Sequence, residues 1–226
     1  MMIHTKIMAK DKIIFKTRNP FEETPSYDEW NIYQDYIKED DIVYDIGAHT
    51  GWMSEYFCQV AKHVHAFEPV PEFFEQLKDY TKEFSNIDYH KIALSDKDDS
   101  ETIIEGQRGA CALGSYMKEK NLPFPDFVKV DIEGFESLFF KTVDFILEKG
   151  KTFFYIEMHT WFPSFKFVQE GGFDWNSLKK HPYTVKKFNW KDPDRIWEEP
   201  ITLGMDDDFN PQKNETFCYL FIPKNI

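Results

Sequence analysis

The chain has 226 residues and a formal net charge of −13 at pH 7, and aromatic residues make up 18% of it. This length is enough for one α/β domain with a full hydrophobic core and short for two. The negative charge disfavours a nucleic-acid or anionic-membrane partner, because basic surfaces bind such partners. Three cysteines without close spacing indicate neither a disulfide framework nor a cysteine-based zinc site. We find no signal segment and no apolar run long enough to span a bilayer, so we expect a cytoplasmic protein without a membrane partner.

Residues 1–40 are expected to form an extension before the main fold. Residues 3–8 and 12–17 predict a small hairpin, since two short β-type runs flank a charged turn. In residues 28–38, apolar and aromatic side chains recur at helical spacing, which predicts a helix that packs on the sheet or covers a ligand.

The stretch VYDIGAHTGWMS, residues 43–54, predicts a buried strand, a tight turn and the start of a helix. A short apolar run is typical of a buried parallel strand. Gly47 and Gly51 then let the backbone turn sharply and approach a ligand that a Cβ would repel. The free N–H groups of the next helix face the same point, so we expect a small cofactor there. Thr50 and Ser54 are expected to cap this helix.

From this stretch onward the chain alternates between strands and helices. We expect strands at 42–46, 63–67, 87–93, 102–104, 127–130, 151–156, 184–188 and 216–222, and helices at 51–61, 71–80, 115–120, 135–149 and 175–180. Residues 105–125 contain three glycines and two prolines and predict mainly a loop. The alternation predicts an open, mostly parallel sheet with helices on both faces.

Acidic side chains accompany the ends of four predicted strands. They are Asp45, Glu68, Asp131 and Glu157. In such a sheet, ligands bind at the carboxyl ends of the strands, where the strand order reverses. We therefore expect these acids to converge, which favours a polyhydroxylated or cationic ligand.

The spacing of the glycines distinguishes between two cofactors. A dinucleotide site has glycines at the first, third and sixth positions, whereas here the pattern is DxGxxxG, with His49 where the second glycine would stand. NAD therefore fits poorly. S-adenosylmethionine (SAM) carries no phosphate and offers a sulfonium cation, an amino-acid head and a ribose diol. Asp45 would orient the amino-acid head, and Glu68 would accept the ribose hydroxyls.

Five segments resemble, in this order, the FkbM-type SAM-dependent methyltransferases: VYDIGAHTGWMS, HAFEPVPEFF, IALSD, FVKVDIEGFES and FFYIEMH. They span residues 41–159, and KVDIEGFE at 129–136 is the most specific of them. The resemblance implies a class I, Rossmann-like methyltransferase fold with a seven-stranded, mostly parallel sheet, helices on both faces and an antiparallel last strand. It also implies O-methylation of a hydroxyl on a sugar, a glycan or a small natural product.

The resemblance also implies roles for individual residues. The amino-acid end of the cofactor would lie against Asp45, Gly47, Ala48, His49, Thr50 and Gly51, the ribose against Glu68 and Pro69, and the adenine against Ala93, Leu94 and Ser95. Asp131 and Glu133 would lie where the methyl group meets its acceptor. We expect a single domain of 226 residues, with a cofactor-binding core at 41–159 and acceptor-side helices and the final strand at 160–226.

A sugar hydroxyl must lose its proton on methylation, and four residues are candidates for the base: Asp131, Glu133, Glu157 and His159. Each has an alternative role. His159 can be structural, Asp131 can hold the sulfonium side of the cofactor, and Glu133 can cap a helix. A magnesium ion on Asp131, Glu157 and His159 is a further alternative, although we assign no metal.

Aromatic side chains after residue 160 are expected either to line the acceptor pocket or to belong to the core: Trp161, Phe162, Phe165 and Trp175. Residues 109–114 predict a flexible flap.

Three hypotheses remain open at this point. The chain is an O-methyltransferase for a small-molecule or glycan acceptor, an NAD-dependent sugar oxidoreductase or epimerase, or a binding module that kept the fold without activity. The sequence leaves the oligomeric state and the acceptor open.

Overall fold

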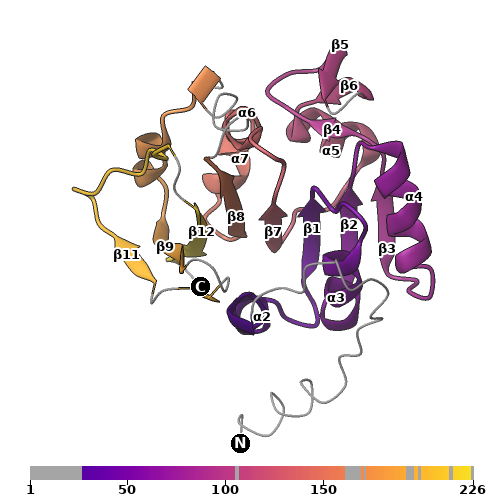
Figure 1. The fold of residues 1–226 in the computed structure, drawn as a ribbon, viewed down its shortest axis with the longest axis horizontal. Coiled ribbons are helices and arrows are strands. Elements are labelled where there is room, and N and C mark those ends of the chain that lie inside the picture. Colours follow the sequence, from indigo (N-terminus) through magenta and orange to yellow (C-terminus); the bar gives the residue numbers. More distant parts are fainter. Residues whose placement is uncertain are drawn as a thin grey trace, which may run out of the picture.

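The computed structural model describes residues 27–104, 107–160, 169–170, 172–191, 196–197, 200–213 and 216–224. Its centre is a mostly parallel sheet that lies between two layers of helices, as Figure 1 shows. The predicted N-terminal hairpin and the aromatic residues Trp161, Phe162 and Phe165 lie outside the described residues.

The central sheet has nine strands. Along its hydrogen-bonded path they are β10 (Ile196–Trp197), β9 (Tyr183–Lys191), β12 (Thr216–Pro223), β8 (Phe153–His159), β7 (Phe127–Val130), β1 (Ile42–Ile46), β2 (His63–Phe67) and β3 (Ile87–His90), and β11 (Ile201–Leu203) pairs with β9 off this path. The five strands from β8 to β3 run parallel to one another, whereas β12 is antiparallel to both β8 and β9.

This topology confirms the predicted mostly parallel sheet and the antiparallel last strand. The predicted count of seven strands is wrong, because eight strands form the path and β11 adds a ninth. The short strands β10 and β11 both pair with β9, which is nine residues long and offers its backbone groups to them.

Helices cover both faces of the sheet. One face carries α2 (Tyr27–Tyr36), α3 (Trp52–Val60) and α4 (Pro71–Tyr80), and the other carries α5 (Leu113–Lys120), α6 (Glu136–Phe140), α7 (Asp144–Leu147) and the 3-10 helix η1 (Trp175–Lys180). Successive strand residues point to opposite faces, so Tyr44 and Val128 belong to one core and Val43 and Phe127 to the other. Trp175 of η1 is fully buried and has a core role.

Helix α2 packs against the sheet. Its Tyr33 is fully buried, and the Tyr33 ring meets the rings of Phe57 and Tyr155 at centroid distances of 5.2 Å and that of Phe127 at 6.0 Å. These edge-on contacts are a favourable aromatic geometry. They decide between the two roles expected for this helix in favour of packing.

The third predicted strand, 87–93, is wrong in its extent. Strand β3 ends at His90, whose carbonyl oxygen accepts the N–H groups of Glu68 and Ile92, and the second bond turns the chain out of the sheet. The chain then enters a separate three-stranded sheet of β4 (Ala93–Leu94), β6 (Gln107–Cys111) and β5 (Asp99–Ile104). Residues 105–125 therefore contain β6 and α5 instead of being mainly a loop, and the predicted flap at 109–114 includes part of both.

Two further expectations change in detail. The single helix predicted at 135–149 is two short helices, α6 and α7, and between them Thr142 donates its hydroxyl to the carbonyl oxygen of Phe139. Strand β8 extends to His159 because β12 pairs with it from Phe154 to His159. Glu157 and His159 thus lie inside β8, and Asp45 lies inside β1, whereas Glu68 and Asp131 directly follow their strands.

No helix in the described part of the chain is long and apolar enough to cross a membrane.

The turn after β1 fits tightly against the residue after β7. Gly47 has φ 82°, and a Cβ at this position would overlap the backbone oxygen of Asp131. Gly109 has a similar φ of 97°, yet a Cβ there would meet nothing within 4 Å. The two glycines therefore share a left-handed backbone conformation, but only Gly47 lies against the backbone of another residue.

We expect Gly47→Ala to lower the free energy of unfolding by about 1–3 kcal/mol more than Gly109→Ala, because both pay the cost of positive φ but only the first also overpacks. Urea unfolding of the two variants and the wild type measures this difference. Equal losses would show that the approach of Gly47 to Asp131 does not constrain the fold.

Candidate functional site

The junction between β1 and β7 is the point where the strand order reverses. From β1 the chain continues to its neighbour β2 on one side, and from β7 it continues to β8 on the other. The turn after β1 is closed by the N–H groups of Gly47 and Ala48, which both donate to the carbonyl oxygen of Phe67 at 3.0 Å. Open α/β sheets bind ligands at this place, beyond the carboxyl ends of the strands.

A buried ladder of charges crosses this junction. Asp45 and Lys129 are register partners on β1 and β7, and the Nζ atom of Lys129 lies 3.9 Å from Oδ1 of Asp45 and 3.0 Å from Oδ2 of Asp131. Ser54 donates its hydroxyl to Oδ2 of Asp45 at 2.6 Å. The predicted capping role of Ser54 and Thr50 is wrong, since Gly51 is the N-cap of α3 and no side chain caps this helix.

The ladder shifts the protonation of its members. Burial raises the pKa of Asp45, and the charge of Lys129 and the Ser54 hydroxyl only partly offset this. Burial alone would lower the pKa of Lys129, but Asp131 and Asp45 raise it well above its usual value. Burial likewise raises the pKa of Asp131, and the positive charges of Lys129 and His159 outweigh it and lower this pKa. Lys129 and Asp131 are therefore both ionised at neutral pH.

One atom of the ladder has no hydrogen-bond partner. Oδ1 of Asp45 is buried, and no hydrogen bond to it is formed within the described residues. An unsatisfied buried carboxylate oxygen is costly, so a donor that reaches this atom would be bound favourably.

His159 lies at the centre of a cluster of carboxylates. Its Nδ1 atom is 2.8 Å from Oε1 of Glu136, and its Nε2 atom lies 3.5 Å from Oδ1 of Asp131 and 3.6 Å from Oε2 of Glu133. Glu136 is fully buried, whereas the Glu133 side chain is 62% exposed. The sequence predicted Asp131, Glu133 and His159 to lie near one another, and the structure brings them together.

Helix capping by Glu133 is not observed. The N-cap of α6 is Phe135, and no side chain caps this helix. Glu133 has φ 53° and Gly134 has φ 102°, so two successive left-handed residues form a tight turn. The N–H of Gly134 donates to Oε1 of Glu136, the same oxygen that contacts His159.

The carboxylates hold His159 in its charged form. Burial alone would lower the pKa of His159, but the hydrogen bond with Glu136 and the charges of Glu136 and Asp131 raise it to about 10. Donor atoms of Asp131, Glu133 and His159 lie within 4.8 Å of one another, a spacing compatible with a metal ion. The imidazolium form that these carboxylates favour carries protons on both ring nitrogens and offers no lone pair to a metal. We assign no metal to this cluster.

Glu68 is held by two backbone donors. Its Oε2 atom accepts the N–H of His49 at 2.9 Å, and its Oε1 atom accepts the N–H of Val70 at 2.7 Å. The His49 ring lies 3.8 Å from that of Phe73 on α4, centroid to centroid. Each carboxylate oxygen has two acceptor sites, so this fixed carboxylate can still accept hydroxyl donors.

The residues expected near adenine lie at the second, three-stranded sheet and not at the central sheet, where the other predicted site residues lie. Ala93, Leu94 and Ser95 are buried at the second, three-stranded sheet, where the N–H of Ser95 donates to the carbonyl oxygen of Cys111 at 2.9 Å. Pro69 is half-buried beside Glu68. Ala93 shares a small apolar cluster with Phe135, next to the turn at Glu133 and Gly134.

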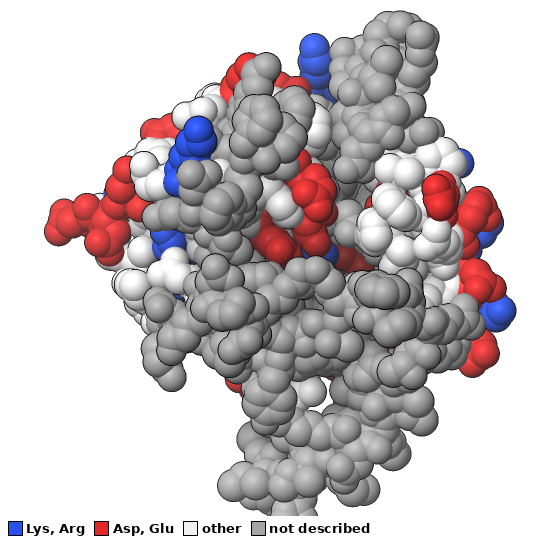
Figure 2. Space-filling view, in the orientation of Figure 1, with Lys and Arg blue, Asp and Glu red and all other residues white. Residues whose placement is uncertain are grey.

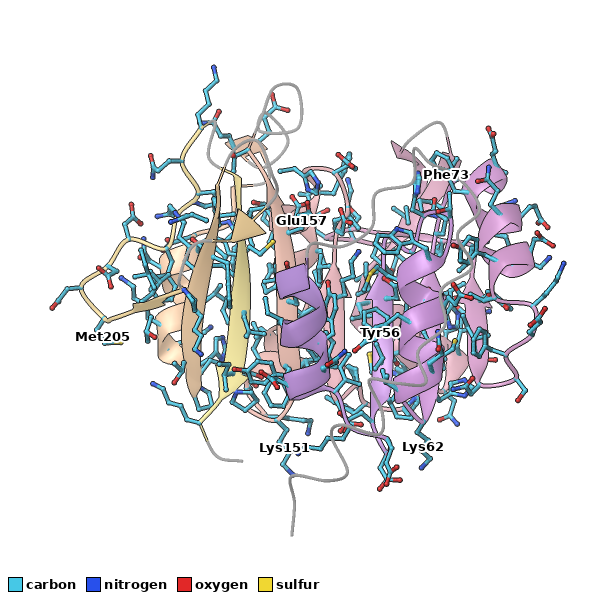
Figure 3. The ribbon with its side chains drawn as sticks, turned by 60° about the horizontal axis from the view of Figure 1, so that its bottom comes forward. Tyr56, Lys62, Phe73, Lys151, Glu157 and Met205 are labelled. Atoms are coloured by element: carbon cyan, nitrogen blue, oxygen red, sulfur yellow. The ribbon has the colours of Figure 1, made fainter. Side chains whose placement is uncertain are left out.

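Acids outnumber bases around the junction. Five acidic side chains, Asp45, Asp131, Glu133, Glu136 and Glu157, surround two cationic ones, Lys129 and His159. Figure 2 shows acidic side chains recessed near the middle of the molecule. In Figure 3, Glu157 and Phe73 lie at one end of the sheet, and Lys62 and Lys151 lie at the opposite end. The site therefore favours a cationic ligand.

The functional roles of Lys129, Glu136 and the Ser54 contact were not predicted from the sequence. A lysine in the middle of a buried strand was the signal for Lys129, because buried charges are paired. Glu136 lay within the quoted segment KVDIEGFES, but only the fold brings it against His159 on β8.

No protein-family model matches the chain, and no curated protein sequence matches it. Among solved structures, it is similar to the methyltransferase FkbM from Methylobacillus flagellatus KT, with a TM-score of 0.56, 15% identity, and 91% of this chain covered against 46% of that one. The chain thus spans about half the length of that structure. An rRNA methylase from Streptococcus thermophilus gives a TM-score of 0.50 at 12% identity, with 89% and 97% covered.

A candidate methyltransferase from Streptococcus mutans, solved in complex with SAH, also gives a TM-score of 0.50, at 9% identity, with 89% of this chain and 100% of that chain covered. At these identities the similarity establishes the fold. The chain has the class I methyltransferase fold.

The environment of His159 predicts a pH dependence of stability. The folded pKa of about 10 lies above the unfolded value of about 6.5. His159 therefore contributes stability that is fully present below pH 6.5 and is lost as the pH rises toward 10.

We expect Glu136→Gln to lower the pKa of His159, because it removes the nearest negative charge. Histidine NMR titrations of both proteins measure this, and an unchanged pKa would contradict the assignment of Glu136 as the main partner.

Proposed function

We propose that the chain is a SAM-dependent O-methyltransferase that transfers a methyl group to a hydroxyl of a sugar, a glycan or a small natural product. The observation that carries this proposal is the acidic junction between β1 and β7, where a left-handed glycine turn, a buried carboxylate with an unsatisfied oxygen and a histidine–glutamate pair lie at the ligand-binding edge of a class I methyltransferase fold.

The residues at this edge fit the parts of SAM. The unsatisfied Oδ1 of Asp45 suits a donor of the amino-acid head, and Gly47 lets that head approach the backbone. Glu68, already oriented by two N–H groups, suits two ribose hydroxyls. The excess of acids suits a sulfonium cation. When bound, SAM supplies an electrophilic methyl group.

The same features disfavour the alternatives. A pyrophosphate would bring negative charge beside Asp45, Asp131 and Glu133, which repel it, so an NAD-dependent oxidoreductase or epimerase fits less well. A binding module without activity would not require a histidine oriented by a buried carboxylate, as His159 is by Glu136. That arrangement is typical of a base that takes a proton from a nucleophile.

We assign His159 the role of the base. Glu136 orients the ring through Nδ1, which leaves Nε2 directed toward Asp131 and Glu133 and available to an acceptor hydroxyl. In the ligand-free chain the surrounding acids keep His159 protonated. A cation bound beside Asp131 opposes this effect, because like charges disfavour the imidazolium, which then releases its Nε2 proton to solvent. The neutral Nε2 can accept the hydroxyl proton, while Asp131, held by Lys129, keeps its place beside it.

The proposed acceptor class rests on charge and on the resemblance of the sequence. The net charge of −13 disfavours polyanionic acceptors, which require basic surfaces. The similarity to an rRNA methylase is one of fold, so RNA stays a competitor that an acceptor screen must include.

Methyl transfer from labelled SAM to a panel of glycosides, glycans, small natural products and RNA tests the proposal. We expect transfer to a hydroxylated small molecule or glycan, and His159→Gln should slow it by about 10²–10⁴-fold through loss of the base. His181→Gln is the matched control, since His181 is also buried and paired with an aspartate, Asp144, at 2.9 Å. Transfer to RNA alone, SAM binding without transfer to any acceptor, or an undiminished rate in His159→Gln would each contradict the proposal.

A further inference from the structure

A second group of histidines lies on the opposite face of the sheet from Asp45. His63 and His65 are two residues apart on β2 and therefore point to the same face of the sheet. Asp88 and His90 are likewise two residues apart on the neighbouring edge strand β3, and His65 and Asp88 are register partners. These side chains share a face with Tyr44 and Phe67, whose rings contact those of His65 and His90. Asp45 follows Tyr44 in β1 and therefore points to the other face.

Three donor atoms of this group converge. Nε2 of His63 is 3.0 Å and Nδ1 of His65 is 3.8 Å from the same oxygen, Oδ2 of Asp88, and all three atoms lie within 4.8 Å of one another. Ligands bound tetrahedrally at zinc distances are separated by about 3.3 Å. Small rotations of the rings therefore suffice to place three ligands around one ion.

A fourth donor atom, a nitrogen of His90, is close to this group. Nε2 of His90 lies 3.0 Å from Nδ1 of His65, and Nδ1 of His90 lies 3.2 Å from the hydroxyl of Tyr116 on α5. His90 is thus oriented from behind by a hydrogen-bonding partner, as metal-binding histidines commonly are.

The group is open to solvent at one end, whereas His65 and His90 are buried. The Asp88 side chain is 60% exposed, so an ion can reach the group from solvent.

We propose that His63, His65 and Asp88 form a binding site for a divalent transition-metal ion, best matched by zinc, with His90 as the nearest further ligand. Two or three imidazoles and one carboxylate are a donor set that zinc prefers, whereas magnesium and calcium prefer oxygen. The ion clamps the edge strand β3 to β2. This site does not depend on the proposed methyl transfer, since it shares no residue with that site.

Calorimetric titration of the untagged, EDTA-treated full chain with zinc chloride tests this proposal. We expect one zinc ion to bind at this group. His63→Gln and Asp88→Asn should each weaken zinc binding by about 10–100-fold or more, because loss of even a residue that only hydrogen-bonds to a metal ligand causes a loss of this size. Circular dichroism verifies that both variants fold. Asp144→Asn is the matched control. The half-exposed carboxylate of Asp144 also contacts a histidine, with Nε2 of His181 at 2.9 Å, but no second histidine joins this pair among the described residues.

The other carboxylate–histidine cluster requires its own control. Glu133→Gln alters the group around His159 and should leave zinc binding unchanged. Absence of zinc binding by the wild type, unchanged binding in both His63→Gln and Asp88→Asn, or loss of binding in Glu133→Gln would each overturn the proposal. Anomalous diffraction from a zinc-soaked crystal with a peak between β2 and β3 would support it.

Discussion

The buried ion pair between Lys129 and Asp131, with Asp45 beside it, is the interaction on which the rest of the site depends. A lysine ammonium in the core is tolerated only where carboxylates surround it, and removal of one partner leaves an uncompensated buried charge. Lys129 and Asp131 belong to the same strand end, so it is the contact of Lys129 with Asp45, 3.9 Å away on β1, that requires β1 and β7 to be neighbours in their observed register. In that register Asp131 meets both the Gly47 turn and His159, so a single electrostatic constraint places the turn and the histidine at one point.

Local patterns predicted the parts of the fold whose signals are local. Strands β2 and β7 have the predicted bounds, because a short apolar run ends in each case at an acid, Glu68 or Asp131. The departure of the chain from the sheet at His90 could not be predicted from local pattern. It depends on the carbonyl oxygen of His90, which accepts the N–H of Glu68, a residue that follows the neighbouring strand β2. The partners of Lys129 had the same limit, because a lysine within an apolar strand indicates that its charge is paired but does not say with which residues of a neighbouring strand.

The two histidine clusters show how surroundings decide chemistry when residue types are the same. Both combine histidine with carboxylates at similar spacing. Around His159, the hydrogen bond with Glu136 and the charges of Glu136 and Asp131 outweigh the effect of burial and keep the ring protonated, which suits a group that responds to a cationic ligand. His65 instead lies beside the imidazoles of His63 and His90 and a single carboxylate, a donor set that suits a metal ion. Each face of the sheet thus presents a different use of the same side chain.

We propose that SAM binds at the carboxyl ends of β1 and β2, with its ribose on Glu68. Calorimetric titration with SAM of the wild type, Glu68→Gln and the control Glu72→Gln, an exposed glutamate nearby on α4, tests this placement. We expect about 10–100-fold weaker binding in Glu68→Gln, because hydrogen bonds to a charged group are lost, and no change in Glu72→Gln. Equal SAM affinity in Glu68→Gln and the wild type, or binding of NAD in preference to SAM, would contradict it.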